Sequence, residues 1–567
     1  MRRSVLALLV LAVVAVIGFA LYAVRHHLPD HSVLVLKLEG DLDEAPPTDL
    51  VGQWTARGPA LPTLLLLLDM AAADPRIDGV VVQEKGLSVG YARLEELRDA
   101  LAKLRAANKR VVALVEVTSL NATRELFLAS AATRVLVDPG SLAPLGGVGG
   151  QFIHLQGFFE KLGIRVQYSR VGEYKSAVEE FAAREMSPAA RQMNTELIDG
   201  VFAQIVDGVA AGRHLSGERV RQLFEVAPGS PKELVEAGLA DEIAGRSDEL
   251  KAGGFDADAH EVEIDAYLRT DPRSLGLRKG PEIALVFGSG TIVDEGSRFQ
   301  RGFTAEDTEK ALDDAAKDDK IRAVVLRVNS PGGEVQASDR IWRAVKRVRE
   351  KKPVVVSMAD YAASGGYYVA SAANAILAEP ATFTGSIGVF MLRPAFSGAY
   401  DKLEIGHELI GRGGMIGISA SDSPLTPAEQ ARLDKLTQDF YAEFLGRVSE
   451  GRGTPTEAID KVGRGRVWLG SDALANNLVD ELGGLAGAVA RARKEAKLEA
   501  EPDPVRVILP APPGLFEQLR GVLRGDAAPE LLHALVVAQL PDLPALPWLP
   551  PLGGGVAYLP PDWLELR

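Results

Sequence analysis

The sequence predicts an α/β protein in which two tandem copies of one domain follow a single N-terminal transmembrane helix. Three observations support this prediction. Segments between residues 76 and 164 return about 241–244 residues later, short β-branched runs alternate with helical patterns, and the chain opens on a long uncharged apolar run. A repeat of this length indicates domain duplication, and strands that alternate with helices are typical of largely parallel sheets buried on both faces.

The N-terminal apolar run covers residues 4–24, which are 21 residues without a charge. At about 1.5 Å per residue, a helix of this length crosses a hydrocarbon layer of about 30 Å. Arg2 and Arg3 precede the run, so the positive-inside bias places the start of the chain in the cytoplasm and the body outside. A cleavable signal peptide is the alternative, but no clear A-x-A site follows. We therefore expect residues 1–27 to be an uncleaved anchor.

Three motif pairs carry the repeat. They are ASAAT (129–133) with ASAAN (370–374), KLGI (161–164) with KLEI (402–405), and RIDGVVV (76–82) with KIRAVVL (320–326). Because their spacing stays within three residues, we expect two copies of one domain, over residues 33–245 and 281–500. Residues 246–280 then form a linker with at most one strand. Residues 501–567 form a proline-rich tail whose role the sequence does not indicate.

Each copy alternates strand and helix patterns. The expected strands include 79–82, 111–115, 324–328 and 354–356, and the expected helices include 93–106, 337–351 and, in the tail, 531–540. Two helix starts are well signalled, at Ser187-Pro188 and at Thr426-Pro427. A hydroxyl cap followed by proline in the first turn satisfies amides that the helix leaves free, and Glu429 adds a capping box to the second start.

The composition excludes several classes of function. The formal net charge of −14 argues against a nucleic-acid surface, because phosphate neutralisation needs clustered Lys and Arg. The absence of cysteine removes disulfides, Cys-ligated zinc and thiol nucleophiles. The sequence has neither a Walker loop nor a clustered ligand set, so we expect no metal and no cofactor.

Ser364 is the candidate nucleophile. It lies in YAASGGYY (361–368), where a strand should give way to a helix. A serine at such a turn holds its hydroxyl away from the backbone, and the helix N-terminus offers free amides to an oxyanion. The alternative is that Ser364 only caps the helix. The first copy has Thr123 at the equivalent place.

The motif NSPGG (329–333) follows the expected strand 324–328. A turn at the carboxyl end of a parallel strand can point amides into the crevice where α/β folds bind ligands. Gly332 and Gly333 are therefore candidates for oxyanion donors or for the edge of a substrate strand. An ordinary type II turn is the alternative.

Lys175, in VGEYKSAV (171–178), is the candidate base, because none of the eight histidines lies in a catalytic-looking setting. A lysine acts as a base only when neutral, so its pKa must fall by about three units from 10.4, which burial between the two copies could supply. Glu173, Glu179 and Glu180 would raise that pKa, and we expect them to point away. The alternative is an ordinary solvated lysine.

Ser386, in TGSIG (384–388), is the candidate that positions the lysine. A neutral amine needs both a donor and acceptors, and a hydroxyl supplies both. The first copy has glycine at this place. A loop hydroxyl that bonds the local backbone is the alternative.

Together, VGEYKSAV, NSPGG, ASGGYY and TGSIG resemble the motifs of signal peptide peptidase A, in the long bacterial form also called protease IV. The anchor and the tandem repeat also resemble that family. The resemblance implies a ClpP/crotonase-like fold built from β-β-α units. It implies Ser364 as nucleophile, Lys175 as general base, Ser386 as the lysine's partner, and glycine amides, including that of Gly365, as oxyanion donors.

The resemblance also implies a membrane-tethered homo-oligomer, commonly a tetramer, on the periplasmic side of the bacterial inner membrane. Family members degrade signal-peptide remnants and other hydrophobic peptides. Three features depart from the family: SLNATR (119–124) replaces a glycine-rich turn, Glu180 replaces a proline, and the tail is additional. Whether the lysine meets the serine within one chain or between subunits stays open. A crotonase-like acyl-thioester enzyme and a non-catalytic peptide-binding membrane scaffold are the alternative functions.

Overall fold

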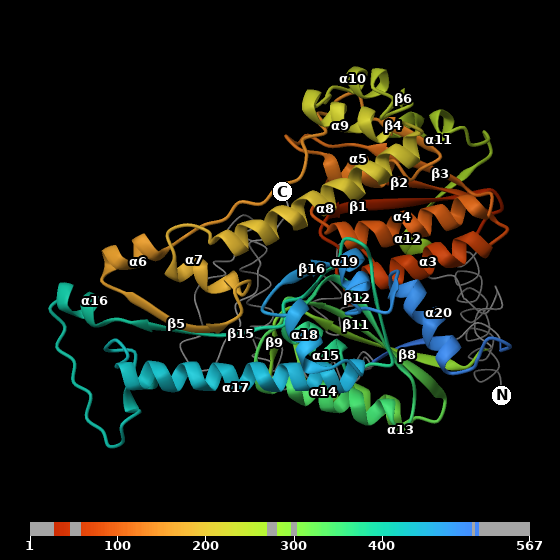
Figure 1. Ribbon diagram of the computed structural model, residues 1–567. Helices are drawn as coiled ribbons and strands as arrows, with labels where there is room; N and C mark the ends of the chain where they lie inside the picture. Colours follow the sequence, from red (N-terminus) through yellow and green to blue (C-terminus); the bar gives the residue numbers. More distant parts are fainter. Residues whose placement is uncertain (1–27, 46–57, 269–279, 296–302, 502–504, 510–567) are drawn as a thin grey trace, which may run out of the picture.

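The computed structural model describes residues 28–45, 58–268, 280–295, 303–501 and 505–509. Two sheets lie one above the other, with helices between them and outside them (Figure 1). The expected membrane helix and the expected tail helix lie outside the described residues. Among the helices that are described, none is both long enough and apolar enough to cross a membrane.

The first sheet has the order β6-β4-β3-β2-β1-β7, and all its strands are parallel. The strands are β1 (Ser32–Gly40), β2 (Ile77–Leu87), β3 (Arg110–Val115), β4 (Arg134–Val137), β6 (Glu242–Ile243) and β7 (His260–Glu263). Leu34 and Leu36 point to the face covered by α3 and α4, whereas Val33 packs on the opposite face. Because both faces are covered, continuous apolar runs form the central strands.

The second sheet repeats this order as β17-β13-β12-β11-β8-β18, again parallel, and β14 and β16 extend it beside the last residues of β12. The strands are β8 (Glu282–Ser289), β11 (Ile321–Ser330), β12 (Val354–Ala363), β13 (Ala375–Ala378), β14 (Phe383–Gly385), β16 (Val467–Leu469), β17 (Glu481–Leu482) and β18 (Val505–Leu509). A short pair, β9 (Ile292–Val293) and β10 (Phe303–Thr304), stands beside it.

The strands β7 and β18 occupy corresponding edges, beside β1 and β8. The segment expected as a linker and the start of the segment expected as a tail therefore each add a strand to a sheet. The repeated units are longer than the expected ranges that ended at 245 and 500. Short edge strands of mixed polarity, such as HEVE at 260–263, lack the apolar pattern by which a strand is predicted.

Helices cover the faces of both sheets. In the first repeat they are α3 (Leu61–Ala73), α4 (Tyr91–Ala106), α5 (Thr123–Ala129), α8 (Pro188–Arg213), α9 (Gly217–Val226), α10 (Pro231–Glu236), α11 (Glu249–Ala252) and α12 (Ile264–Tyr267). In the second they are α13 (Ala305–Lys317), α14 (Val335–Arg349), α15 (Gly365–Ala370), α17 (Pro427–Arg452), α18 (Thr456–Val462), α19 (Gly470–Ala475) and α20 (Leu485–Glu495). The long helices α8 and α17 begin at the predicted caps, Ser187 and Thr426.

One hydrophobic core joins the two repeats, because residues of α3, α4 and α20 and of both sheets form a single buried cluster. A buried ion network lies beside it. Arg327 of β11 is 2.9 Å from a Glu44 oxygen and 2.6 Å from a Glu96 oxygen, both in the first repeat. Two guanidinium–carboxylate contacts in a dry interface make the relative placement of the repeats specific, since a buried charge without a partner is costly.

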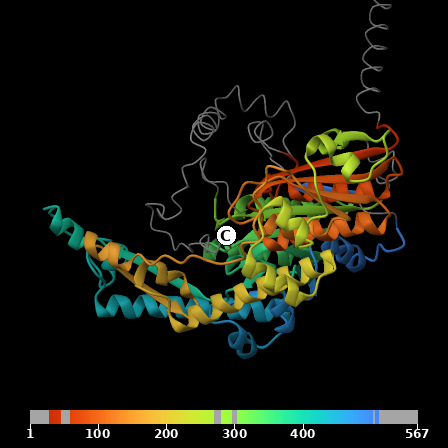
Figure 2. The same cartoon turned by 90° about the horizontal axis from the view of Figure 1, so that it is seen from above.

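An arm projects from the body and is made by both repeats (Figures 1 and 2). The first repeat supplies α6 (Gln156–Leu162), β5 (Arg165–Val171) and α7 (Glu179–Ala182), and the second supplies β15 (Val389–Ala395), α16 (Ser397–Lys402) and the first half of α17. β5 and β15 form an antiparallel ribbon in which Val171 lies opposite Val389 and Arg165 opposite Ala395. The chain thus brings residues just beyond β5 next to residues just before β15.

Candidate active site

Ser364 stands where β12 ends and α15 begins, as expected. Its backbone has φ 53° and ψ −116°, which a residue with a Cβ rarely adopts. The conformation is held by its amide, which donates to Gly385 O at 2.8 Å, and by its carbonyl, which accepts from Tyr368 N at 2.9 Å. The side chain is only 3% exposed. A strained turn held from both sides directs the hydroxyl away from the strand.

Lys175 follows β5 and reaches the same point from the first repeat. Its Nζ lies 3.0 Å from Ser364 Oγ, 2.9 Å from Ser386 Oγ and 3.1 Å from the Ser386 carbonyl oxygen. Ser386 itself has φ 50°, so its hydroxyl and its carbonyl both face the amine. The structure therefore brings the three predicted side chains together, within one chain.

Burial lowers the pKa of Lys175 to about 7. Two of the three carboxylates that could oppose this effect, Glu173 and Glu179, are engaged elsewhere. Glu179 accepts from Arg170 at 2.8 Å and from the Ser187 amide at 2.9 Å, and Glu173 lies 3.6 Å from an Arg464 nitrogen. Each of these two carboxylates is thus paired with an arginine. A lysine with this pKa is about half neutral at pH 7 and largely neutral above it, and a general base must be neutral.

Two glycine amides face the region beside Ser364. Ile292 bonds the carbonyl of Gly332 and the amide of Glu334, so the amide of Gly333, between them, faces the other way. Gly365 is the first residue of α15, whose first amides the helix leaves free. A Cβ on Gly365 would lie 3.1 Å from Gly333 N, which shows how close these two amides are.

The amide of Gly332 has another use, since it donates to Ser330 Oγ at 3.2 Å. Gly332 has φ 117°, and a Cβ there would meet Ser364 Cβ at 2.8 Å. Glycine is thus needed at this position for close approach.

The corresponding place in the first repeat is closed. Thr123 donates its hydroxyl proton to Asn121 Oδ1 at 2.7 Å and accepts from Gly147 N at 3.0 Å. The buried carboxylate of Glu125 accepts from Leu87 N at 2.6 Å. The Thr123 hydroxyl is thus already engaged as a donor and as an acceptor.

One element of the site was not expected from the sequence. The turn 463–466 (GRGR) packs on the backbone of Lys175, and a Cβ on Gly465 would lie 2.5 Å from the lysine Cβ. The two glycines two residues apart are the signal that could have indicated a close backbone approach. Among the described residues, no group of histidine and acidic side chains is placed to hold a metal ion.

The chain is similar to several known peptidases. It is 33% identical over 478 residues to the chloroplastic serine protease SPPA of Arabidopsis thaliana, covering 82% of this chain and 69% of that one. It is 32% identical to protease 4 of Salmonella typhi (76% and 71% covered) and 30% identical to protease 4 of Haemophilus influenzae (86% and 82%). A ClpP1 variant from Listeria monocytogenes matches 36% of this chain and 93% of its own at 19% identity, with a TM-score of 0.24.

The fold and the three peptidases that match in sequence define the class of protein: a serine peptidase with two tandem α/β domains. A family model for Clp protease matches residues 303–380, around the strands that carry NSPGG and Ser364. The model for peptidase family S49 matches residues 103–253 and 346–499, together more than half of the chain. The chain belongs to peptidase family S49.

Proposed function

We propose that this serine peptidase is a membrane-anchored endopeptidase with a serine–lysine dyad, Ser364 and Lys175, and that it degrades signal-peptide remnants and other unfolded hydrophobic peptides. The observation that carries the dyad is the buried 3.0 Å approach of the lysine Nζ to the serine Oγ. Burial of the amine also removes the charge that would prevent it from accepting a proton.

The chemistry runs in two halves. Neutral Lys175 takes the proton of Ser364 Oγ as the oxygen attacks the peptide carbonyl, and the oxyanion is stabilised by the amides of Gly333 and Gly365. The lysine then gives its proton to the departing amine, and an acyl-enzyme remains. Water, deprotonated by the same lysine, then attacks the ester carbonyl. The bond between the acyl carbon and Ser364 Oγ breaks, the lysine returns its proton to Oγ, and the acid leaves.

An apolar surface next to the dyad supports apolar substrates. Val178 and Phe390 are buried together, and Ala177, Val335 and Leu392 pack against them while partly exposed. Ala177 and Val178 come directly after the lysine segment, and Val335 follows Gly333 by two residues. A peptide bonded to the Gly333 edge would lay its side chains along this surface, where burying apolar area is favourable.

Two further parts of the proposal concern location and assembly. Residues 4–24 anchor the chain in the bacterial inner membrane, with the catalytic body on the periplasmic side. The chain forms a ring-shaped homotetramer through two segments of the arm. By the repeat, residues 148–154 correspond to β15 and residues 406–412 correspond to β5, but neither segment has regular secondary structure here.

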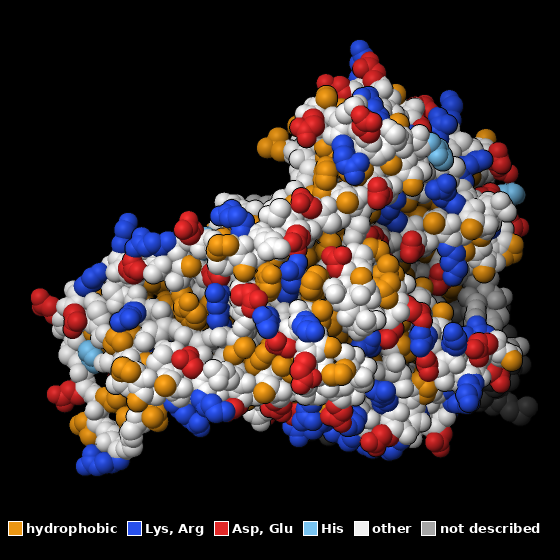
Figure 3. All heavy atoms as spheres, in the orientation of Figure 1, with side chains coloured by type: hydrophobic (Ala, Val, Ile, Leu, Met, Phe, Trp, Pro, Cys, Tyr) orange, Lys and Arg blue, Asp and Glu red, His pale blue; other side chains and the backbone are white. Residues whose placement is uncertain are grey.

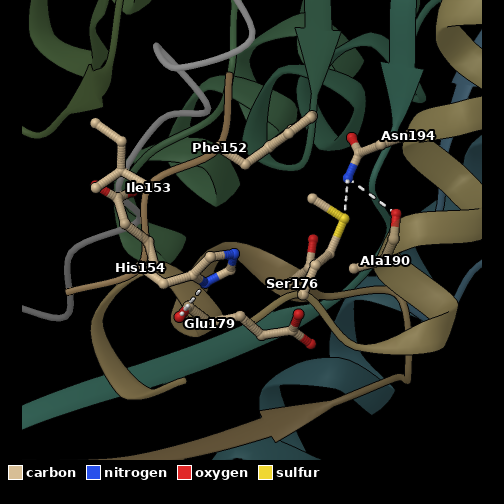
Figure 4. Close-up of a pocket in the computed structure, with 9 residues that line it drawn as sticks. Phe152, Ile153, His154, Ser176, Glu179, Ala190 and Asn194 are labelled. Carbon is tan, nitrogen blue, oxygen red and sulfur yellow. Dashed lines mark hydrogen bonds between the residues drawn. The ribbon is translucent and has the colours of Figure 1, made fainter. Parts of the chain in front are cut away.

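If residues 148–154 of one chain paired with residues 406–412 of the next, the two segments would form a second ribbon like that of β5 and β15. Repeating this head-to-tail contact would close a ring of chains. Apolar side chains are exposed on both segments, with Ile153 60% and Ile410 85% accessible. Hydrophobic side chains also gather at the outer end of the arm, at lower left in Figure 3. A shallow hollow beside the first of these segments is lined by Phe152, Ile153 and His154 and, from the start of α8, by Ala190 and Asn194 (Figure 4).

Peptide digestion tests the catalytic proposal. Ser364→Ala and Lys175→Met should each lower cleavage of an apolar unfolded peptide by at least about 10³-fold, because the two groups act as one unit. Circular dichroism should show an intact fold. Full activity in either variant would rule out the dyad, and turnover of an acyl-thioester without peptide cleavage would favour the crotonase-like alternative.

Light scattering tests the proposed ring. Ile410→Lys should convert the assembly into monomers, and an unchanged mass would exclude this interface.

A further inference from the structure

The turn 463–466 of the second repeat hydrogen-bonds to the segment that carries Lys175 and to the segment that carries Ser386. Its three consecutive residues Arg464, Gly465 and Arg466 each make one backbone bond to a neighbouring segment. The Arg464 carbonyl accepts from Tyr174 N at 3.1 Å, Gly465 N donates to Ile387 O at 2.8 Å, and the Arg466 carbonyl accepts from Ser386 N at 2.7 Å. One short segment thus spans from the residue before Lys175 to Ser386.

The side chain of Arg466 fixes the same segment from outside. Its guanidinium lies over the ring of Tyr174 at 4.9 Å and over that of Trp468 at 4.2 Å, and it forms an ion pair with Glu196 of α8. The Arg466 side chain is 17% exposed. Stacking of a planar guanidinium on two aromatic rings is specific to arginine, because lysine has no planar group to stack.

The first repeat supplies a comparison within the same chain. Its corresponding turn, Ala227-Pro228-Gly229, also bonds inward: Gly229 O accepts from Ala143 N at 2.9 Å, and Pro228 O from Leu145 N at 3.3 Å. This turn carries no arginine, and Leu145, whose amide bonds Pro228 as the Ser386 amide bonds Arg466, stands at the place of Ser386. Backbone bonds from this turn are therefore common to both repeats, whereas the Arg-Gly-Arg sequence occurs only in the turn that packs against the lysine segment.

We infer that the turn 463–466 is the positioning element of the dyad: Arg466 and Gly465 hold Lys175 in its dry contact with Ser364 and Ser386. The inference rests on the proposed function, since a positioned lysine matters only if it is the base. Gly465 allows the backbones to touch, because its φ is 79° and an added Cβ would lie 2.5 Å from Lys175 Cβ, so the position requires glycine. Arg466 keeps Tyr174, and with it the lysine segment, packed against the second repeat.

The test compares the pH dependence of kcat/KM for the full-length protein and its variants. Arg466→Ala removes both stacks and admits water beside Lys175, so kcat should fall by roughly tenfold or more. The acidic limb of the profile, where kcat/KM falls as the pH is lowered, should move to higher pH by about half a unit or more. Arg466→Lys should show the same shift, because it keeps the charge but not the stacking. Gly465→Ala should lose about 100-fold in kcat, since a 1 Å displacement of a reacting group has that effect.

Arg98→Ala is the matched control. Arg98 lies over the ring of Phe127 at 4.2 Å in the first repeat and bonds the carbonyls of Phe127 and Gly208, so its loss removes a similar stack remote from the dyad. It should lower Tm but leave the acidic limb in place. If Arg466→Ala behaves like this control, with lower Tm and an unmoved limb, the inference is wrong. Activity that survives Lys175→Met would instead refute the proposed dyad, which is a separate result.

Discussion

Val171, the last residue of β5, lies opposite Val389, the first residue of β15. Lys175 follows Val171 by four residues and Ser386 precedes Val389 by three, so this register brings the lysine Nζ to 2.9 Å from Ser386 Oγ. A slip of one residue would turn the alternate side chains of β5 to the other face of the ribbon. The pairing of two strands, one from each repeat, therefore determines whether the lysine reaches its partners.

Replacing Lys175 with methionine should stabilise the fold in a pH-dependent way. Because the native pKa of Lys175 is about 7 and the unfolded value about 10.4, the unfolded state binds more protons between these values, and the wild type gains stability as pH rises through that window. The advantage of Lys175→Met should thus be greatest at and below pH 7 and shrink by about 1.4 kcal/mol per pH unit above it. Denaturant unfolding at pH 6, 8 and 9.5 measures this. A constant difference between the two proteins would contradict a depressed lysine pKa.

Removing the Ser386 hydroxyl should weaken the base without removing it. Ser386→Ala deletes the 2.9 Å contact to Nζ, although the backbone carbonyl at 3.1 Å and Ser364 remain. We expect kcat to fall by about 10- to 100-fold, less than the loss of a general base, with KM nearly unchanged. Steady-state kinetics on a fluorogenic peptide separates the two parameters. A change confined to KM would mean that Ser386 contacts the substrate instead.

The backbone of Ser364 predicts a stability difference between two inactive variants. Its φ of 53° strains any residue with a Cβ, and glycine adopts it freely. Ser364→Gly should therefore unfold with a free energy about 1 kcal/mol higher than that of Ser364→Ala, since both lose the hydroxyl and only one keeps the strain. Urea titration of the pair checks this, and equal stabilities would argue against a strained turn.

Filling the space between the glycine amides should stop the reaction. A Cβ on Gly365 would lie 3.1 Å from Gly333 N and 2.5 Å from Ser338 Oγ. Gly365→Ala should lower kcat by about 10²- to 10³-fold, as for the loss of an oxyanion donor. Gly446→Ala, in α17 with open space around the added methyl, is the matched control and should keep full activity. An active Gly365→Ala variant would place the oxyanion elsewhere.

The sequence allowed the two sheets and the three polar side chains of the site to be predicted, because each depends on a local pattern. Central strands such as β11 are apolar over most of their length, and Ser364, Lys175 and Ser386 stand in short motifs on one repeat and not on the other. Predicting that these three side chains meet required only the further expectation that the two repeats pack against each other.

Other parts of the molecule depend on contacts between distant residues. Arg327 interrupts an apolar strand, and only its partners Glu44 and Glu96, from the other repeat, explain why a charge is buried there. The edge strand β18 gains its structure from pairing with β8, far earlier in the chain. The turn 463–466 acts on the site through its contact with Tyr174, which is almost 300 residues away in the sequence. No local pattern in either segment predicts that the two are in contact.

The pH dependence of kcat/KM tests the central claim, an uncharged lysine as the base, most directly. With a peptide substrate that has no titrating group between pH 5 and 10, activity should rise with a midpoint near the lysine pKa of about 7 and then stay level through pH 9. His154→Gln should give the same midpoint, because that ring contacts the Glu179 carbonyl and not the dyad. A profile that is flat from pH 6 to 9, or one that rises only near pH 10, would contradict the account.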